Sequence, residues 1–219
     1  MQTTNSDVSR HLKKSLQRTF ELPVVSSNIV DGLKKYYKNE VNRRGGVYEE
    51  TDALRESFVS IANFLADEKK RFALCLVGSV GNGKSTMAVA IRDVINYLIS
   101  NNKTFLNPAS DNSYVSIVKA RDLSEWYKSD MKSFKKAMTK QVVIIDDVGE
   151  DLAEISVYGH IHSPFVEFVE YRYDHMLPFV ITSNLGSDGI YDKYNNERFR
   201  DRMHEIAKGI KFKDKSFRK

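Results

Sequence analysis

Residues 72–85 read FALCLVGSVGNGKS, and this stretch decides the fold that the sequence predicts. The first six residues form a continuous apolar run, which is typical of a strand buried on both faces of a sheet. The remainder, Gly78 to Ser85, matches the pattern G-x-x-x-x-G-K-[ST]. In such a loop, backbone N–H groups curl around phosphate oxygens, the lysine reaches the β- and γ-phosphates, and the hydroxyl coordinates Mg²⁺. We therefore expect a phosphate-binding loop between a buried strand and a helix.

The helix after this loop is marked by apolar residues at helical spacing between Met87 and Leu98. Its N-terminus directs a positive dipole toward the loop, which favours a bound anion. The residues expected to hold a nucleotide here are Gly78, Gly81, Asn82, Gly83, Lys84, Ser85 and Thr86.

Strands and helices alternate along the rest of the chain. Further strands are predicted at 114–118, 142–145 and 179–182, with a final edge strand at 209–212, and further helices at 52–66, 123–138, 165–173 and around 199–206. Ser163 and Pro164 are expected to cap and begin the helix at 165–173. This alternation predicts an α/β fold with a parallel sheet.

Two aspartates follow the strand predicted at 142–145. A magnesium nucleotide needs an acid at the end of a strand next to the loop, so Asp146 is expected to hold Mg²⁺. Asp147 would then orient or deprotonate the attacking water. The alternative is that the two aspartates merely end the strand.

Asn184 closes the strand predicted at 179–182. A polar side chain at the carboxyl end of a parallel strand points into the crevice where ligands bind, so Asn184 is placed to hydrogen-bond the γ-phosphate or the water. The alternative is a turn asparagine before Gly186.

The net charge of +5 is unevenly distributed. Residues 10–44 hold nine Lys and Arg against three acids, and residues 193–219 hold ten against four, while residues 45–192 are acidic overall. Basic ends suggest a polyanionic partner such as DNA, and a solvated charged surface is the alternative.

Composition excludes several classes. A single cysteine forms no internal disulfide, and no segment has the length or apolar character of a signal peptide or a membrane span. We expect a cytoplasmic protein that does not enter a membrane. Residues 1–44 are expected to form a basic, partly helical arm, with two short helices interrupted at Pro23, and residues 45–219 the main domain with a short basic tail.

The motifs together resemble those of the DnaC-like AAA+ ATPases, a family of bacterial and phage helicase loaders, and of the related IstB transposition helper ATPases. In order along the chain, the motifs are Gly78–Ser85, Ile144–Gly149, Ser163-Pro164 with Tyr171-Arg172-Tyr173, Ile181–Leu185, Tyr194 with Glu197–Met203, and Ser216-Phe217-Arg218.

The resemblance implies an AAA+ core of five parallel strands with the loop-bearing strand at its centre, ATP hydrolysis with Mg²⁺, a ring or spiral homo-oligomer, and action on DNA. Asp146 and Asp147 match its Walker B positions, and Asn184 matches sensor 1. Arg202 matches the arginine finger, which acts on a neighbouring subunit's nucleotide, with Arg198 as the nearby alternative. Arg218 matches a terminal arginine near the nucleotide. Few residues follow the arginine motif, so no separate lid domain is expected.

The function predicted first is a helicase loader in DNA replication that acts with a replicative helicase and single-stranded DNA. The second is a helper ATPase for transposition that acts with a transposase, because the two share the ATPase core. A small-molecule P-loop kinase explains Asn184 and Arg202 less well, and a nucleotide-binding scaffold without hydrolysis is a further alternative.

Overall fold

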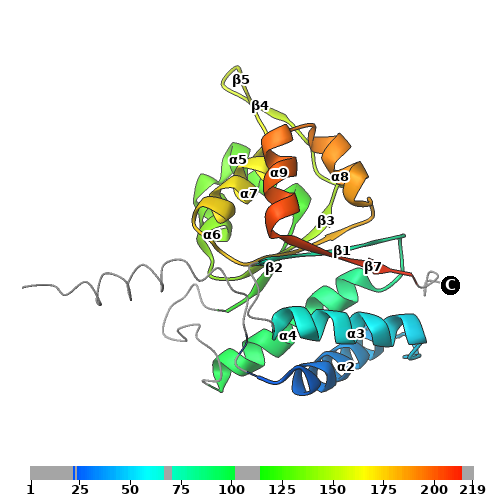
Figure 1. Cartoon of the computed structure of the whole chain (residues 1–219). Coiled ribbons are helices and arrows are strands. Elements are labelled where there is room, and N and C mark those ends of the chain that lie inside the picture. Colours follow the sequence, from blue (N-terminus) through cyan, green and yellow to red (C-terminus); the bar gives the residue numbers. More distant parts are fainter. Residues whose placement is uncertain (1–21, 23, 67–70, 102–113, 214–219) are drawn as a thin grey trace, which may run out of the picture.

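The computed structural model describes residues 22, 24–66, 71–101 and 114–213. A five-stranded parallel sheet forms its middle layer, and helices cover both faces (Figure 1). The strands lie in the order β2-β3-β6-β1-β7, with the bounds β1 Ala73–Gly78, β2 Ser116–Lys119, β3 Val143–Val148, β6 Phe179–Ser183 and β7 Ala207–Phe212. The predicted α/β fold with a five-stranded parallel sheet is confirmed.

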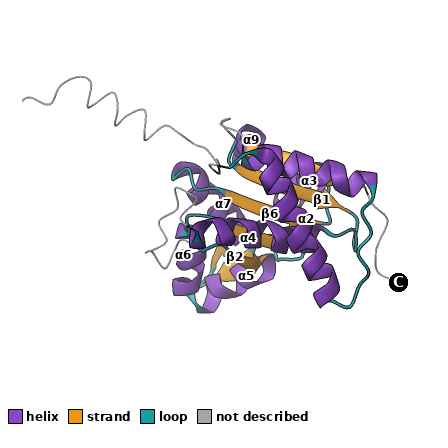
Figure 2. Ribbon diagram, turned by 90° about the horizontal axis from the view of Figure 1, so that it is seen from below, coloured by secondary structure: helices purple, strands orange, loops and turns teal. Residues whose placement is uncertain are grey.

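Side chains of the strands alternate between two hydrophobic cores because both faces of the sheet are covered. In β1, Leu74 and Leu76 join the core under helices α2 (Ser26–Arg43), α3 (Asp52–Leu65) and α4 (Lys84–Ser100), the three helices on the near side of the sheet in Figure 2. Ala73 and Cys75 join the opposite core. That core is covered by helices α5 Ala120–Ser129, α6 Met131–Thr139, α7 Pro164–Asp174, α8 Ser187–Tyr194 and α9 Glu197–Ile206. Among the described helices, none combines the length and apolar character that a bilayer span needs.

The resemblance implied that the strand carrying the glycine loop lies at the centre of the sheet, and this prediction is wrong. Strand β1 lies between β6 and β7, and β6 is the central strand. Only β7 lies beyond β1 on one side of the sheet, where it pairs with β1 over its whole length, whereas β6, β3 and β2 lie on the other side. Residues 207–212, which follow α9 in the described chain, form this strand.

The described part of the predicted arm packs on the domain. After Pro23, residues 26–43 form one helix, α2, and Ile29, Leu33 and Tyr37 are buried in the core that also contains β1 and α4, while the helix expected before Pro23 lies outside the described residues. Apolar residues spaced by four place one stripe of α2 against the domain. Residues 26–43 therefore belong to the domain core, while residues 1–21 lie outside the described residues.

Smaller differences concern element ends. The helix predicted at 123–138 is two helices, because Asp130 leaves helical geometry and its side chain caps α6 at Ser133. Ser163 does not cap α7; its hydroxyl donates to the carbonyl of Ala153. A hairpin of β4 (Ile155–Val157) and β5 (His160–His162) was not predicted, since strands this short carry little periodicity.

Arg172 is fully buried and holds two loops together. Its guanidinium donates to the carbonyls of Met138, Lys140 and Gln141 before β3 and to that of Pro178 before β6. Burial lowers the pKa of Arg172 to about 9, so the side chain keeps its charge at neutral pH. The contact fixes the starts of the two strands whose other ends carry the polar residues predicted for the site.

Replacing Arg172 by methionine should destabilise the protein, because the carbonyls that the guanidinium satisfies would remain buried without donors. We expect the free energy of unfolding to fall by about 3 kcal/mol, measured by urea denaturation. Arg121→Met is the control, since the side chain of Arg121 is 71% exposed. Equal unfolding midpoints for the two variants would contradict this role.

Candidate functional site

The glycine loop lies between β1 and α4, as the sequence predicts, and its backbone is sterically constrained. Gly78 and Gly83 have positive φ angles of 152° and 93°. A Cβ atom at Gly78 would lie 2.6 Å from the Phe212 carbonyl oxygen, and one at Gly83 would collide with the Tyr37 hydroxyl. Both positions require glycine, and they bring β7 and α2 directly against the loop.

The ammonium group of Lys84 is enclosed by the glycine loop and forms hydrogen bonds with it. Its Nζ donates to the carbonyls of Gly78 and Ser79, at 2.8 and 2.7 Å, and to the side-chain oxygens of Asn82 and Asn184, at 3.0 and 2.9 Å. The contact with Asn184 joins the loop to the end of β6, 100 residues later in the chain. Lys84 and Asn184 therefore meet, as the strand order requires.

Asp146 is buried at the carboxyl end of β3 and accepts hydrogen bonds from three neighbouring elements. Ser85 of α4 and Thr182 of β6 donate to Oδ1, at 3.0 and 2.5 Å, and Lys119 of β2 donates to Oδ2 at 2.7 Å. Burial alone would raise the pKa of Asp146, but the hydrogen bonds from Lys119, Thr182 and Ser85 and the charge of Lys119 outweigh it and lower the pKa. Asp146 is therefore ionised beside the Ser85 hydroxyl.

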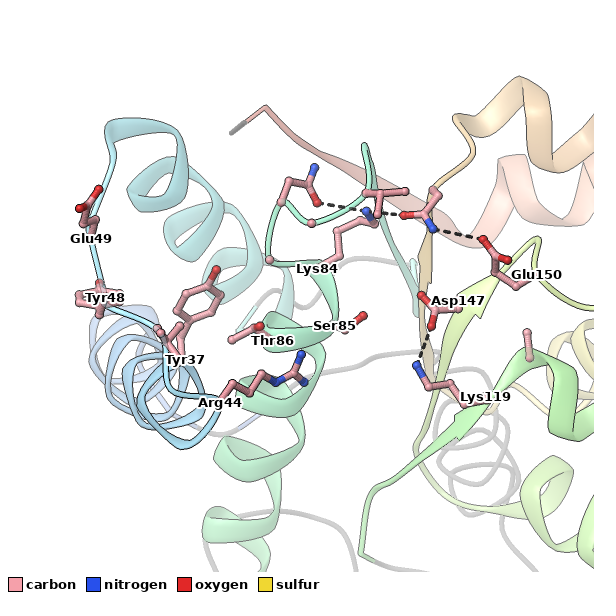
Figure 3. A pocket seen from close by; sticks show the side chains of 18 of the residues that line it. Tyr37, Arg44, Tyr48, Glu49, Lys84, Ser85, Thr86, Lys119, Asp147 and Glu150 are labelled. Atoms are coloured by element: carbon pink, nitrogen blue, oxygen red, sulfur yellow. Dashed lines mark hydrogen bonds and ion pairs between the residues drawn. The ribbon is translucent and has the colours of Figure 1, made fainter. Parts of the chain in front are cut away.

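Asp147 sits on a local irregularity of β3. Its φ is +61°, the register of β3 and β6 shifts between Ile145 and Val148, and its N–H donates to the Thr182 hydroxyl. The carboxylate, about one third exposed, accepts from the Lys119 ammonium at 2.6 Å (Figure 3). The irregularity turns the Asp147 side chain toward the pocket instead of into the core.

Lys119 and Glu150 belong to the site although sequence reasoning missed them. Lys119 ends β2, and the rule that predicted Asn184, a polar residue at the carboxyl end of a parallel strand, applies to it equally. Glu150 follows β3 by two residues, and its carboxylate accepts from the Asn184 amide at 3.4 Å. Gly149 could have indicated a turn from the sequence alone, and this turn brings Glu150 back to the site.

A pocket of about 730 Å³ opens over these residues, within the roughly 300–1,000 Å³ typical of small-molecule sites. Its polar end holds the glycine loop, Thr86, Lys119, Asp147, Glu150 and Asn184. Its other wall comes from α2 and the loop that follows, with Tyr37, Val41, Arg44, Val47 and Tyr48 (Figure 3). The predicted arm thus contributes one wall of the pocket.

The two candidate arginine fingers lie on α9 and do not line this pocket. Arg202 is buried: its guanidinium donates to Asp174 at 3.0 Å and lies 4.6 Å from the centre of the Tyr173 ring. Arg198 is two-thirds exposed and lies 3.5 Å from the Glu170 carboxylate. Arg198 therefore projects from the surface while Arg202 does not, and Arg218 lies outside the described residues.

The donor set for Mg²⁺ consists of oxygen atoms. The Ser85 hydroxyl and the Asp146 carboxylate are adjacent, and hydroxyl and carboxylate oxygens are the ligands that Mg²⁺ prefers. Among the described residues, no group of three or more His, Cys, Asp and Glu side chains is arranged to bind a metal by itself. The residues fit a cation that is shared with phosphate oxygens.

Comparison by sequence identifies no relative: neither a protein-family model nor a curated protein matches the chain.

Comparison with solved structures finds several proteins of similar fold. The crystal structure of DnaI is 22% identical, with a TM-score of 0.57, and the match covers 80% of this chain and 89% of that chain. The DnaC helicase loader is 17% identical, with a TM-score of 0.57 and coverages of 82% and 99%. The replication initiator DnaA bound to AMPPCP and single-stranded DNA is 15% identical, with a TM-score of 0.51, and the match covers 83% of this chain but 51% of that one. The chain therefore has the fold of DnaI and of the DnaC helicase loader, and the resemblance to DnaC-like helicase loaders is confirmed at the level of this fold.

Proposed function

We propose that this protein is a Mg²⁺-dependent ATPase that acts on DNA, most simply as a helicase loader in replication. One observation carries the proposal: the glycine loop with Lys84 and Ser85, and Asn184 from a distant segment, line one pocket, and Asp146 lies behind it, hydrogen-bonded to Ser85. Except within the loop, these residues are far apart in the sequence, so the fold of the chain is what brings them together. Their convergence is what phosphoryl transfer to water requires.

The residues have distinct roles in this proposal. The loop N–H groups and Lys84 bind the phosphates of ATP, and Ser85 and Asp146 would hold Mg²⁺, which supplies positive charge against the phosphate oxygens. Asn184, held by Lys84 at 2.9 Å, orients the γ-phosphate or the attacking water. From its position in the sequence, Asp147 is the carboxylate proposed to orient or deprotonate this water.

The base of the nucleotide is proposed to occupy the wall formed by α2 and the following loop. Val41, Val47 and Tyr48 offer apolar surface there, and Val47 is 84% exposed. Burying such side chains against a flat base is favourable. Residues outside the loop motif would thereby contribute to nucleotide affinity.

The oligomer remains a proposal that rests on the arginines of α9. Arg198 is exposed and available to a neighbouring subunit, whereas Arg202 would first have to leave Asp174 and Tyr173. An arginine supplied to a neighbour's γ-phosphate accelerates hydrolysis by about 10³–10⁵ in related P-loop enzymes. Both arginines are therefore candidates, and only one needs rearrangement.

The basic ends offer less free positive charge than the sequence suggests. Lys34 pairs with Glu50 at 2.8 Å, Arg44 pairs with Glu40 at 2.6 Å, and Arg202 pairs with Asp174. The proposal of DNA as a ligand is therefore supported mainly by the fold shared with a DnaA that was solved with single-stranded DNA. The same core would serve a transposition helper, and the identity of the partner, a replicative helicase or a transposase, separates the two.

The first prediction concerns turnover. The protein should hydrolyse ATP with Mg²⁺, single-stranded DNA should stimulate it, and Lys84→Ala should lower the rate at least about 100-fold by removing the phosphate-binding ammonium. Phosphate release is measured with and without DNA, and Lys208→Ala, on the edge strand β7, is the control. Transfer of phosphate to a metabolite, with no release to water, would instead support a kinase.

The second prediction concerns the arginine finger. The ATPase rates of Arg198→Ala and Arg202→Ala are each compared with that of the wild type, and replacing the arginine that acts as the finger should lower the rate. That variant should regain part of its ATPase activity when it is mixed with Lys84→Ala. The mixture places an intact arginine next to an intact nucleotide site. Absence of any recovery in oligomers shown to be mixed would count against a finger supplied by a neighbour.

The third prediction concerns Lys119, whose ammonium neutralises Asp146 and Asp147. In Lys119→Met the pKa of Asp146 should rise. The lowered pKa stabilises the folded protein above the unfolded value of about 3.9, and this contribution is lost as the pH falls through the lower folded value. The variant should therefore be less stable by about 1 kcal/mol at pH 7, and the difference should shrink as the pH falls below about 3.9.

Urea denaturation at several pH values measures this difference, with Lys128→Met as the control for an exposed lysine. Mg²⁺ with a non-hydrolysable ATP analogue should narrow the gap at pH 7, because the cation would take over the charge compensation at Asp146. A gap that neither pH nor the magnesium nucleotide changes would contradict both the ion pair and the proposed metal site.

A further inference from the structure

Glu150 is carried into the site by a tight turn. Its N–H donates to the carbonyl of Asp147 at 3.0 Å, which closes a four-residue turn directly after β3. Gly149 makes the turn possible: its φ is +104°, and a Cβ atom there would lie 2.7 Å from the side chain of Leu185. The position of Glu150 is thus set by backbone geometry.

The next residue anchors this turn to the domain. Asp151 is buried, and its Oδ1 accepts from the Gly149 N–H at 3.1 Å and from the Tyr194 hydroxyl at 2.6 Å. The Lys193 ammonium donates to the Asp151 carbonyl at 2.6 Å. Contacts from α8 therefore anchor Asp151, and the Asp151 side chain in turn holds Gly149 on the other side of Glu150, which restricts where the Glu150 side chain can reach.

The carboxylates of Asp147 and Glu150 have different surroundings. That of Asp147 is paired with the Lys119 ammonium at 2.6 Å, on the β2 side of the pocket. That of Glu150 lies on the same side of the pocket, next to the end of β6, and accepts from the Asn184 amide at 3.4 Å (Figure 3). Within the described part of the chain Glu150 forms no ion pair with a lysine, arginine or histidine, whereas the Asp147 carboxylate is occupied by the Lys119 ammonium.

A chain of hydrogen bonds connects this carboxylate to the phosphate-binding lysine. Lys84 donates to Asn184 Oδ1, and Asn184 Nδ2 donates to Glu150 Oε1. The chain places Glu150 beside the γ-phosphate end of the pocket. A general base must lie within hydrogen-bond reach of the water it deprotonates, and it works best when no counterion already occupies it.

We propose that Glu150, rather than Asp147, is the catalytic carboxylate that accepts the proton of the attacking water, an inference that rests on the proposed ATPase function. As the water oxygen bonds to the γ-phosphorus, its proton passes to Glu150. The bond from that phosphorus to the β,γ-bridging oxygen breaks, and ADP leaves with the electron pair. Glu150 then returns its proton to the released phosphate or to solvent. Asp147 then has a structural role: its carboxylate binds the Lys119 ammonium, which also binds Asp146.

The test compares three variants with the wild type in single-turnover ATP hydrolysis, with Mg²⁺-nucleotide affinity measured separately by equilibrium binding. Glu150→Gln should lower the hydrolysis rate at least about 100-fold and leave affinity within threefold. Asp147→Asn should lower the rate less than Glu150→Gln does. Glu154→Gln is the matched control, an exposed glutamate four residues further along the chain and outside the pocket.

Chemical rescue separates a proton acceptor from a structural role. Glu150→Gly leaves space near Asn184, and added formate should restore part of its hydrolysis rate, because formate supplies a free carboxylate. Formate should have no such effect on Lys84→Ala. Rescue would not be expected if Glu150 merely shaped the turn.

Two results would overturn the inference and leave the ATPase intact: a Glu150→Gln variant as active as Glu154→Gln, or slow Glu150 variants that formate does not accelerate. A wild-type protein that hydrolyses no ATP, or whose activity survives Lys84→Ala, would instead refute the proposed function itself. The wild type and Lys84→Ala are therefore measured first.

Discussion

The geometry of the site depends on the buried carboxylate of Asp146. A buried charge is costly unless it is paired and hydrogen-bonded, and here Ser85, Thr182 and Lys119 supply those bonds from three elements. Lys119 and Asp146 are also partners in the register of β2 and β3. A slip of one residue would turn one of them to the opposite face and leave the carboxylate unpaired. One ionised group thus fixes the register of the strands that carry the site.

Much of this arrangement could be predicted from the sequence because it follows from rules of sheet topology. The glycine loop follows β1, Asn184 follows β6, and Asp146 lies near the carboxyl end of β3, and the carboxyl ends of parallel strands meet at one edge. What escaped prediction depends on contacts between distant segments. The burial of Arg202 against Asp174 is an example, since helical spacing does not say which face of α9 is covered.

The N-terminal segment shows why charge was a poor guide to architecture. Its lysines and arginines suggested an exposed arm, but Leu33 and Tyr37 form an apolar stripe that packs on α4. Glu40, near the end of α2, accepts from Arg43 and Arg44, and its pKa falls to about 2 because these hydrogen bonds outweigh the effect of burial. One negative charge therefore offsets part of the two positive charges beside it, and this basic run forms a wall of the pocket instead of a separate arm.

Acidic residues are concentrated at the end of β3, where Asp146, Asp147, Glu150 and Asp151 fall within six residues. Like charges this close repel, and the fold compensates them unequally. Hydroxyls and Lys119 stabilise Asp146, the same lysine stabilises Asp147, and a tyrosine hydroxyl with a backbone N–H stabilises Asp151. Glu150 receives one long bond from an amide. Among the described residues no side-chain cation pairs with Glu150, so the contacts that hold the neighbouring carboxylates in place leave its carboxylate open to the pocket.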